Sequence, residues 1–154
     1  MATTNVRIRD YPVVRCVNCS GSTRTLSALC SGTFPLEQIH PHSRPAALAA
    51  EASGAQTDFW TMHEYLFEHQ NHLEELDLQK YATELGLDAD RFERDRRSPE
   101  IARRIDQDIN SGERSGVEGT PTFYVNDIRH DGGFDLESLR QAIVTSMQRI
   151  SQAR

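Results

Sequence analysis

The feature that most constrains this chain is its middle segment, from Pro41 to about Gly116, where apolar residues recur at helical spacing almost throughout. This spacing predicts amphipathic helices that bury one face each and pack together as a bundle. Capping and breaking residues divide the segment into several short helices. Helices are expected to start near Pro45, at Thr57 or Asp58, before Leu76, at Asp88 and at Ser98, and to stop at Gly54 and Gly86.

Beyond Gly116 the pattern changes to short strands. The run from Thr120 to Val125 is β-type, and Asn126-Asp127 is a turn signal. Ile128 to His130 is therefore expected to return as the second strand of a hairpin. Asp135 then caps a final helix. The apolar residues of that helix fall on one stripe and are Leu136, Leu139, Ile143, Met147 and Ile150.

Composition and charge argue against several classes of protein. A length of 154 residues is that of one domain, and 37% hydrophobic with 26% charged residues is compatible with a folded chain. The net charge is −6 and the arginines are interleaved with acidic residues, which argues against a nucleic-acid partner. No apolar run approaches the roughly 20 residues of a membrane span. The first residues lack the apolar stretch of a secretory signal, so the chain as written is expected in the cytoplasm, or exported if its true N-terminus is missing.

The three cysteines lie in the first quarter of the chain, where Gly, Ser and Thr are frequent and periodicity is weak. Cys16 and Cys19 form a Cys-x-x-Cys motif, which serves as a redox dithiol or as half of a zinc site. With His40 and His42 they would nominally make a Cys2His2 set, but the His-Pro-His spacing is shorter than such sites use. We therefore expect no metal site. Cys30 has no partner at a suitable spacing and is interpreted as incidental.

Four spaced motifs lie in order along the chain. They are Phe34-Pro35-Leu36-Glu37-Gln38-Ile39-His40-Pro41-His42-Ser43 with an Ala-rich helix after it, Phe59-Trp60-Thr61-Met62-His63, Gly116-Val117-Glu118-Gly119-Thr120-Pro121-Thr122-Phe123, and Phe134-Asp135-Leu136-Glu137-Ser138-Leu139. Together, from about Phe34 to Ile150, they resemble the DsbA-like thioredoxin-fold family. The resemblance implies an α/β, thioredoxin-like fold with an α-helical insert at about 45–116. A cis-proline loop, hairpin and helix would follow at about 117–152, all within one domain over 1–154.

The family activity is thiol–disulfide exchange, so the resemblance implies an oxidoreductase that acts on protein thiols and disulfides without a cofactor. It also implies a cis peptide bond between Thr120 and Pro121, in a loop that presents backbone to a substrate peptide. A cis bond before proline costs only about 0.5–1 kcal/mol, so a tight loop can fix it. On this interpretation Cys16 is the nucleophile, and Cys19 resolves the mixed disulfide.

The sequence departs from the family pattern in the position of the Cys-x-x-Cys motif, which carries the chemistry. The family has a strand and a Cys-x-x-Cys motif ahead of a Tyr-Pro-Val-Val-like stretch, whereas here Tyr11-Pro12-Val13-Val14 precedes Cys16. The N-terminal βα portion is therefore expected to be truncated or degenerate. A second hypothesis stays open: a redox-inactive thioredoxin-fold module that binds a polypeptide or a partner, in which Cys16 and Cys19 are incidental. A dithiol placed next to Pro121 would favour the enzyme.

Overall fold

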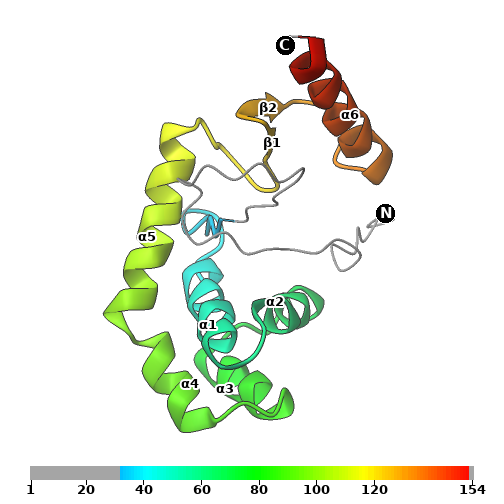
Figure 1. Ribbon diagram of the computed structural model, residues 1–154. Helices are drawn as coiled ribbons and strands as arrows, with labels where there is room; N and C mark the ends of the chain where they lie inside the picture. Colours follow the sequence, from blue (N-terminus) through cyan, green and yellow to red (C-terminus); the bar gives the residue numbers. More distant parts are fainter. Residues whose placement is uncertain (1–31, 153–154) are drawn as a thin grey trace. The chain divides into compact units, whose positions relative to one another are not determined.

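The computed structural model describes residues 32–152, which belong to two compact units. The first unit, Gly32–Gly116, is helical, and the second begins at Val117. The helical unit contains α1 (Ser43–Gln56), α2 (Phe59–Glu68), α3 (Glu75–Glu84), α4 (Ala89–Arg96) and α5 (Pro99–Arg114), as Figure 1 shows. The second unit contains β1 (Phe123–Val125), β2 (Ile128–His130) and α6 (Leu136–Gln152).

The predicted capping residues start three of the helices. Asp58 accepts hydrogen bonds from the backbone N–H groups of Trp60 and Thr61 at the start of α2. Asp88 and Ser98 cap α4 and α5 in the same way, by accepting from backbone N–H groups in the first turn. Each cap satisfies a donor that has no partner inside its helix. These three starts are confirmed.

Pro45 lies in the first turn of the first helix, as predicted, but the predicted stop at Gly54 is wrong by two residues. α1 begins at Ser43 and continues through Gly54 to Gln56. A glycine inside a helix costs only about 1 kcal/mol relative to alanine, and packing against neighbouring helices outweighs that cost. After α3, by contrast, Gly86 does end the helix: its φ of +71° is the left-handed conformation that glycine adopts at helix ends.

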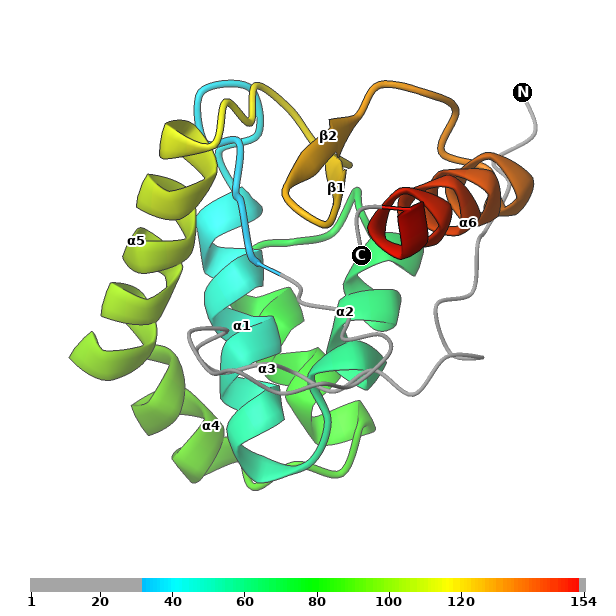
Figure 2. The ribbon, with the colours of Figure 1, turned by 45° about the horizontal axis from the view of Figure 1, so that its top comes forward.

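The core of the helical unit is built around α1. Figure 1 and Figure 2 both show α1 in the middle of this unit, between α2 on one side and α5 on the other, and α1 also contacts α3 and α4. Its buried residues are mostly alanines, which allow the neighbouring helices to approach closely. The buried apolar cluster consists of Ala49, Ala50, Ala52, Met62, Leu66, Leu78, Tyr81, Ala82, Leu87 and Phe92.

Polar contacts join the helices outside the apolar cluster. Arg96 of α4 is buried, and its guanidinium donates hydrogen bonds to the carboxylates of Glu75 on α3 and Glu93 on α4. Removing a buried charge from water is costly, and these carboxylates offset that cost by accepting the guanidinium protons. Elsewhere in the unit, the carboxylate of Asp108 on α5 accepts from the backbone N–H of Thr33 over 2.8 Å. The start of the described chain is thereby tied to α5.

The second unit contains the predicted hairpin. β1 and β2 pair antiparallel, with Val125 opposite Ile128. The two residues between them, Asn126 and Asp127, have positive φ angles of 50° and 64°, which is the pattern of a type I′ turn. This turn has the right-handed twist that the two flanking strands need. The turn and the bounds of β2 predicted from the sequence are confirmed, whereas β1 begins at Phe123, three residues after the start of the β-type run at Thr120.

The final helix packs against β1. Its start is capped as predicted, because the carboxylate of Asp135 accepts from the backbone N–H of Ser138 over 3.0 Å. The buried residue of α6 is Ser146. The large apolar residues of α6 are about half exposed instead, and they are Leu136, Ile143, Val144, Met147 and Ile150. Among the residues that the structure describes, no helix has both the length and the apolar character needed to cross a membrane.

Candidate substrate-binding loop

The loop from Gly119 to Thr122 leads directly into β1. Thr120 and Pro121 are both exposed, and the peptide bond between them is cis. The hydroxyl of Thr122 donates a hydrogen bond to the backbone carbonyl of Gly119 over 2.6 Å. This short bond closes the loop around the two residues that it carries. Thr120 and Pro121 therefore lie at the solvent-facing tip of a small closed turn.

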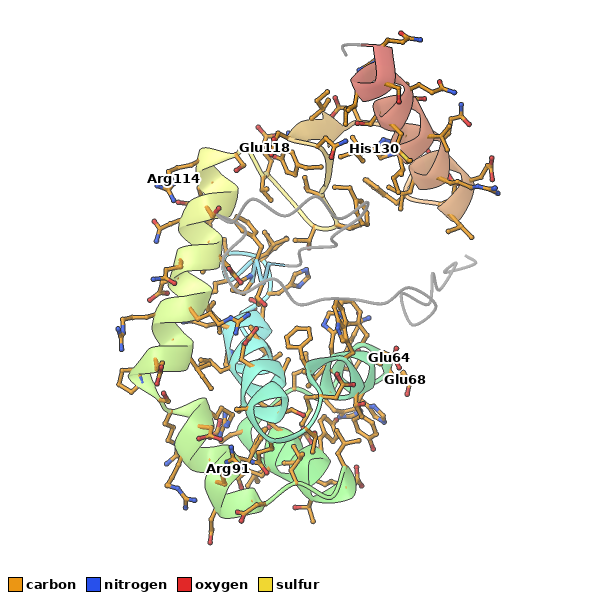
Figure 3. All side chains as sticks on the ribbon, in the orientation of Figure 1. Glu64, Glu68, Arg91, Arg114, Glu118 and His130 are labelled. Atoms are coloured by element: carbon orange, nitrogen blue, oxygen red, sulfur yellow. The ribbon has the colours of Figure 1, made fainter. Side chains whose placement is uncertain are left out.

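β1, the strand after the loop, holds the C-terminal end of the loop in place. Phe123 is half-buried, and its ring lies 6.0 Å from the ring of Phe134, centre to centre. Tyr124, which points to the opposite face of the strand, is exposed. Because Phe123 follows Thr122 directly, its packing anchors the loop at the base of the hairpin. Glu118, on the chain just before the loop, is exposed, and Figure 3 labels it there.

A histidine at the end of β2 closes the next loop. His130, labelled in Figure 3, makes a contact of 2.9 Å from Nε2 to the carbonyl oxygen of Gly133. A carbonyl can only accept, so Nε2 carries the proton and donates. Gly132 allows this approach, since a Cβ atom there would lie 2.7 Å from the imidazole ring.

The hydroxyl of Ser138 lies 3.4 Å from the same Nε2 atom. Because that nitrogen is protonated, it cannot accept the serine proton. Activation of a serine requires a base within hydrogen-bond reach with a free lone pair. His130 and Ser138 are therefore a structural contact of the β2–α6 loop and do not form a nucleophilic pair.

The residues predicted from the sequence fall into two groups. Thr120 and Pro121 lie in the described loop. Cys16 and Cys19, like Cys30, lie outside the described residues. The two histidines considered for a Cys2His2 site, at positions 40 and 42, are exposed. Across residues 32–152, no three His, Cys, Asp or Glu side chains are grouped in a way that could hold a metal ion.

Sequence reasoning missed the role of the Thr122 side chain. The signal for it was present, because threonine hydroxyls often donate to the carbonyl three or four residues earlier in the chain. In the printed sequence Thr122 follows Gly119 by three residues. The resemblance points to Thr120 and Pro121 and says nothing of the neighbouring residue that closes the loop.

An aromatic group on α2 surrounds a histidine. The ring of His63 stacks on Phe59 at 5.4 Å and lies 4.7 Å from Phe67, with Trp60 edge-on at 5.3 Å. Burial lowers the pKa of His63 below its ordinary value, and the nearby carboxylate of Glu64 opposes that shift only in part. His63 is consequently a neutral side chain of the helical unit at neutral pH.

Comparison with known families identifies one match. The sequence model of the DSBA-like thioredoxin domain matches residues 34–144. This range covers the helical unit, the loop at Thr120 and Pro121, the hairpin and half of α6. It starts after all three cysteines. No solved structure matches the chain.

Curated relatives carry the name of a transporter. The chain is 44% identical over 113 residues to the Na(+)/H(+) antiporter NhaA 3 of Salinispora tropica, which covers 73% of this chain and 17% of the antiporter. It is 41% identical over 112 residues to the Na(+)/H(+) antiporter NhaA 1 of Mycolicibacterium vanbaalenii, covering 71% and 18%. The match to the Na(+)/H(+) antiporter NhaA of Herminiimonas arsenicoxydans is 34% identical over 147 residues, covering 93% and 24%. The chain thus spans a quarter or less of the length of these relatives.

Proposed function

Because the chain belongs to the family of DSBA-like thioredoxin domains, we propose that it exchanges thiols and disulfides with protein substrates through Cys16 and Cys19. The substrate would be an extended polypeptide that lies against the loop at Thr120 and Pro121. No transport activity is proposed from the antiporter relatives, since the chain matches only a small share of their length.

The reaction has two balanced steps when the protein reduces its substrate. The Cys16 thiolate attacks one sulfur of a substrate disulfide; a mixed disulfide forms, and the other substrate sulfur leaves as a thiolate that takes a proton from water. The Cys19 thiolate then attacks Cys16 in the mixed disulfide. The second substrate thiol leaves, and Cys16 and Cys19 are left joined, having given two electrons to the substrate. Oxidation of a substrate dithiol is the reverse sequence.

The observation that carries the proposal is the family match across the loop region. Residues 34–144 include Gly119 to Thr122, the loop that the resemblance implies would present backbone to a substrate peptide. In this chain the tip of the loop, Thr120 and Pro121, is exposed; the loop is closed by the Thr122 hydroxyl and anchored by Phe123. An exposed, ordered turn at the start of a strand supports binding of an extended peptide by backbone hydrogen bonds.

The test is a redox titration of the full chain in glutathione buffers, followed by alkylation and mass spectrometry of each cysteine. We expect Cys16 and Cys19 to change state together with one midpoint potential. A Cys30→Ser variant should keep that transition, because Cys30 takes no part in it. Cys16→Ser and Cys19→Ser should each abolish it. Independent alkylation of all three cysteines in the unmodified chain would contradict the proposal.

The residue at which the family match begins favours a second candidate function. The match begins at residue 34, so Cys16 and Cys19 lie outside the part of the chain that the family model matches. A redox-inactive module that binds polypeptide through the same loop is therefore the second candidate function. Peptide binding by a variant in which all three cysteines are replaced by serine, together with no linked pair in the titration, would favour this module.

A further inference from the structure

We infer that Thr122 is a positioning residue for the polypeptide substrate. Its hydroxyl would hold the loop in the form that receives the peptide backbone at Thr120 and Pro121. The inference rests on the proposed function for its redox assay, and it also has a binding readout that needs no cysteine.

The geometry assigns this role to the hydroxyl. The bond from the Thr122 hydroxyl to the Gly119 carbonyl spans 2.6 Å and encloses the two residues of the loop tip. Thr122 is half-buried, whereas Thr120 and Pro121 are exposed. The side chain that closes the turn is thus on the inside, and the groups available to a ligand are on the outside. Thr122 acts on the substrate only through the loop that it holds.

Gly119 contributes no side-chain contact that would hold the loop. Its residue type carries no side chain, and a Cβ atom built there would meet nothing within 4 Å. Glycine also has more backbone freedom than other residues, so a loop that begins with it has more conformations to lose when it orders. Once the hydroxyl is removed, the Gly119 carbonyl can pair with water, and the loop samples other conformations. A peptide would then have to order the loop as it binds, which weakens binding.

The effect of removing the Thr122 hydroxyl should depend on the size of the substrate. A peptide contacts the loop along its backbone, whereas a small disulfide such as oxidised glutathione needs little beyond access to the reactive sulfur. Loss of the Thr122 hydroxyl should therefore raise KM for a peptide and leave the reaction with oxidised glutathione unchanged. One neutral hydrogen bond corresponds to roughly a three- to tenfold change in an equilibrium constant.

The experiment compares four forms of the full chain: unmodified, Thr122→Val, Thr122→Ser and Thr145→Val. Valine has the shape of threonine without the hydroxyl, and serine keeps the hydroxyl without the methyl group. Thr145 is the matched control, because its hydroxyl also donates to a backbone carbonyl, that of Gln141, over 2.8 Å, in α6 of the same unit. The probes are a single-cysteine peptide joined to glutathione by a disulfide, oxidised glutathione, and a fluorescent peptide with serine in place of its cysteine.

The expected result is a roughly three- to tenfold higher KM of Thr122→Val for the glutathione-linked peptide, with kcat retained. Binding of the serine peptide, followed by fluorescence anisotropy, should weaken by the same factor. Rates with oxidised glutathione should not change, Thr122→Ser should recover most of the affinity, and Thr145→Val should match the unmodified chain.

The other outcomes separate the two claims. If the unmodified chain exchanges disulfides and Thr122→Val does so with the same KM, the role of Thr122 is wrong and the proposed function stands. An equal loss of rate with the peptide and with oxidised glutathione would show general damage and would also overturn that role. If the unmodified chain binds the serine peptide without exchanging disulfides, and Thr122→Val binds it less tightly, the role stands and the redox proposal fails. Neither binding nor exchange by the unmodified chain would overturn both.

Discussion

The side-chain amide of Asn126 donates a hydrogen bond to the hydroxyl of Ser146 over 2.7 Å, and so joins the tip of the hairpin to the last helix. Asn126 also takes the left-handed backbone conformation that the turn needs, with φ of 50°. Asparagine tolerates that conformation better than most residues do. Ser146 is buried, and the exposed Asn126 amide gives its hydroxyl a hydrogen-bond partner. One residue therefore sets the turn geometry and anchors the hairpin to α6.

The neighbouring turn position should accept glycine with a gain in stability. Asp127 has a φ of 64°, which costs free energy for a residue with a Cβ atom and none for glycine. We expect Asp127→Gly to stabilise the hairpin by about 0.5 kcal/mol, the net of relieved strain and greater freedom of the unfolded chain. Native-state hydrogen exchange of the β1 and β2 amides measures this gain in stability. The control is Asp90→Gly in α4, where glycine should destabilise the helix by about 0.5 kcal/mol, from its lower helix propensity and the loss of a first-turn acid. Faster exchange of the hairpin amides in Asp127→Gly would contradict the prediction.

Loss of the cap at the start of α2 should destabilise the helical unit. The Asp58 carboxylate accepts from the backbone N–H groups of Trp60 and Thr61 and from the Thr61 hydroxyl. Asp58→Ala should lower the free energy of unfolding by about 1 kcal/mol, because the first-turn donors lose their acceptor. Denaturant unfolding followed by helical circular dichroism measures the change. Asp58→Ser, which keeps an accepting oxygen, should lose less; equal losses in both variants would exclude capping as the cause.

Protonation of His63 should destabilise the fold. Burial lowers the pKa of His63 below the ordinary 6.5, so the folded state binds fewer protons than the unfolded state as the pH falls below that value. Stability should consequently fall as the pH drops through 6.5. His63→Gln should flatten this part of the profile of unfolding free energy against pH, and the exposed control His72→Gln should leave it in place. An NMR titration in which the His63 ring titrates at or above 6.5 would refute the prediction.

The ion pair between α3 and α4 should make the helical unit sensitive to acid. The hydrogen bonds from Arg96 lower the pKa of Glu75 below its ordinary 4.5, although partial burial opposes the shift. A lowered carboxyl pKa stabilises the fold above the unfolded-state value, and this contribution is lost as the pH falls through the folded-state value. Glu75→Gln should therefore weaken the loss of stability as the pH falls below 4.5. Glu113→Gln, at an exposed position of α5, is the control. An unaltered acid profile in Glu75→Gln would show that this pair does not contribute.

Local signals in the sequence sufficed for most of the elements. Asp58, Asp88 and Ser98 are caps because a short side chain with an oxygen can reach the first N–H groups of a helix, which is a property of a few neighbouring residues. The turn at Asn126 and Asp127 was predictable for a similar reason. The continuation of α1 through Gly54 was not predictable from local signals. Whether a helix stops at a glycine depends on what packs against it, and α1 is packed on several sides.

The periodicity of apolar residues predicted the last helix but not which of its side chains are buried. The stripe that includes Leu136, Ile143 and Met147 is present, yet these side chains are about half exposed, and the buried residue is Ser146. An apolar stripe shows that one face of a helix differs from the other, and it carries no information on which partner covers that face. For the candidate site, the loop at Thr120 and Pro121 was recognised through its resemblance to a family. The bond from Thr122 to Gly119 depends on how the loop folds back on itself, which residue types alone do not specify.

The location of the buried cluster along the chain bears on the order of folding. All of its residues lie between Ala49 and Phe92, in one continuous segment. Contacts between residues that are near in sequence close short loops, and chains rich in such contacts fold quickly. On the ribosome, synthesis of this segment is complete before β1, β2 and α6 exist. The helical unit can therefore acquire its core while the hairpin and the last helix are still being made.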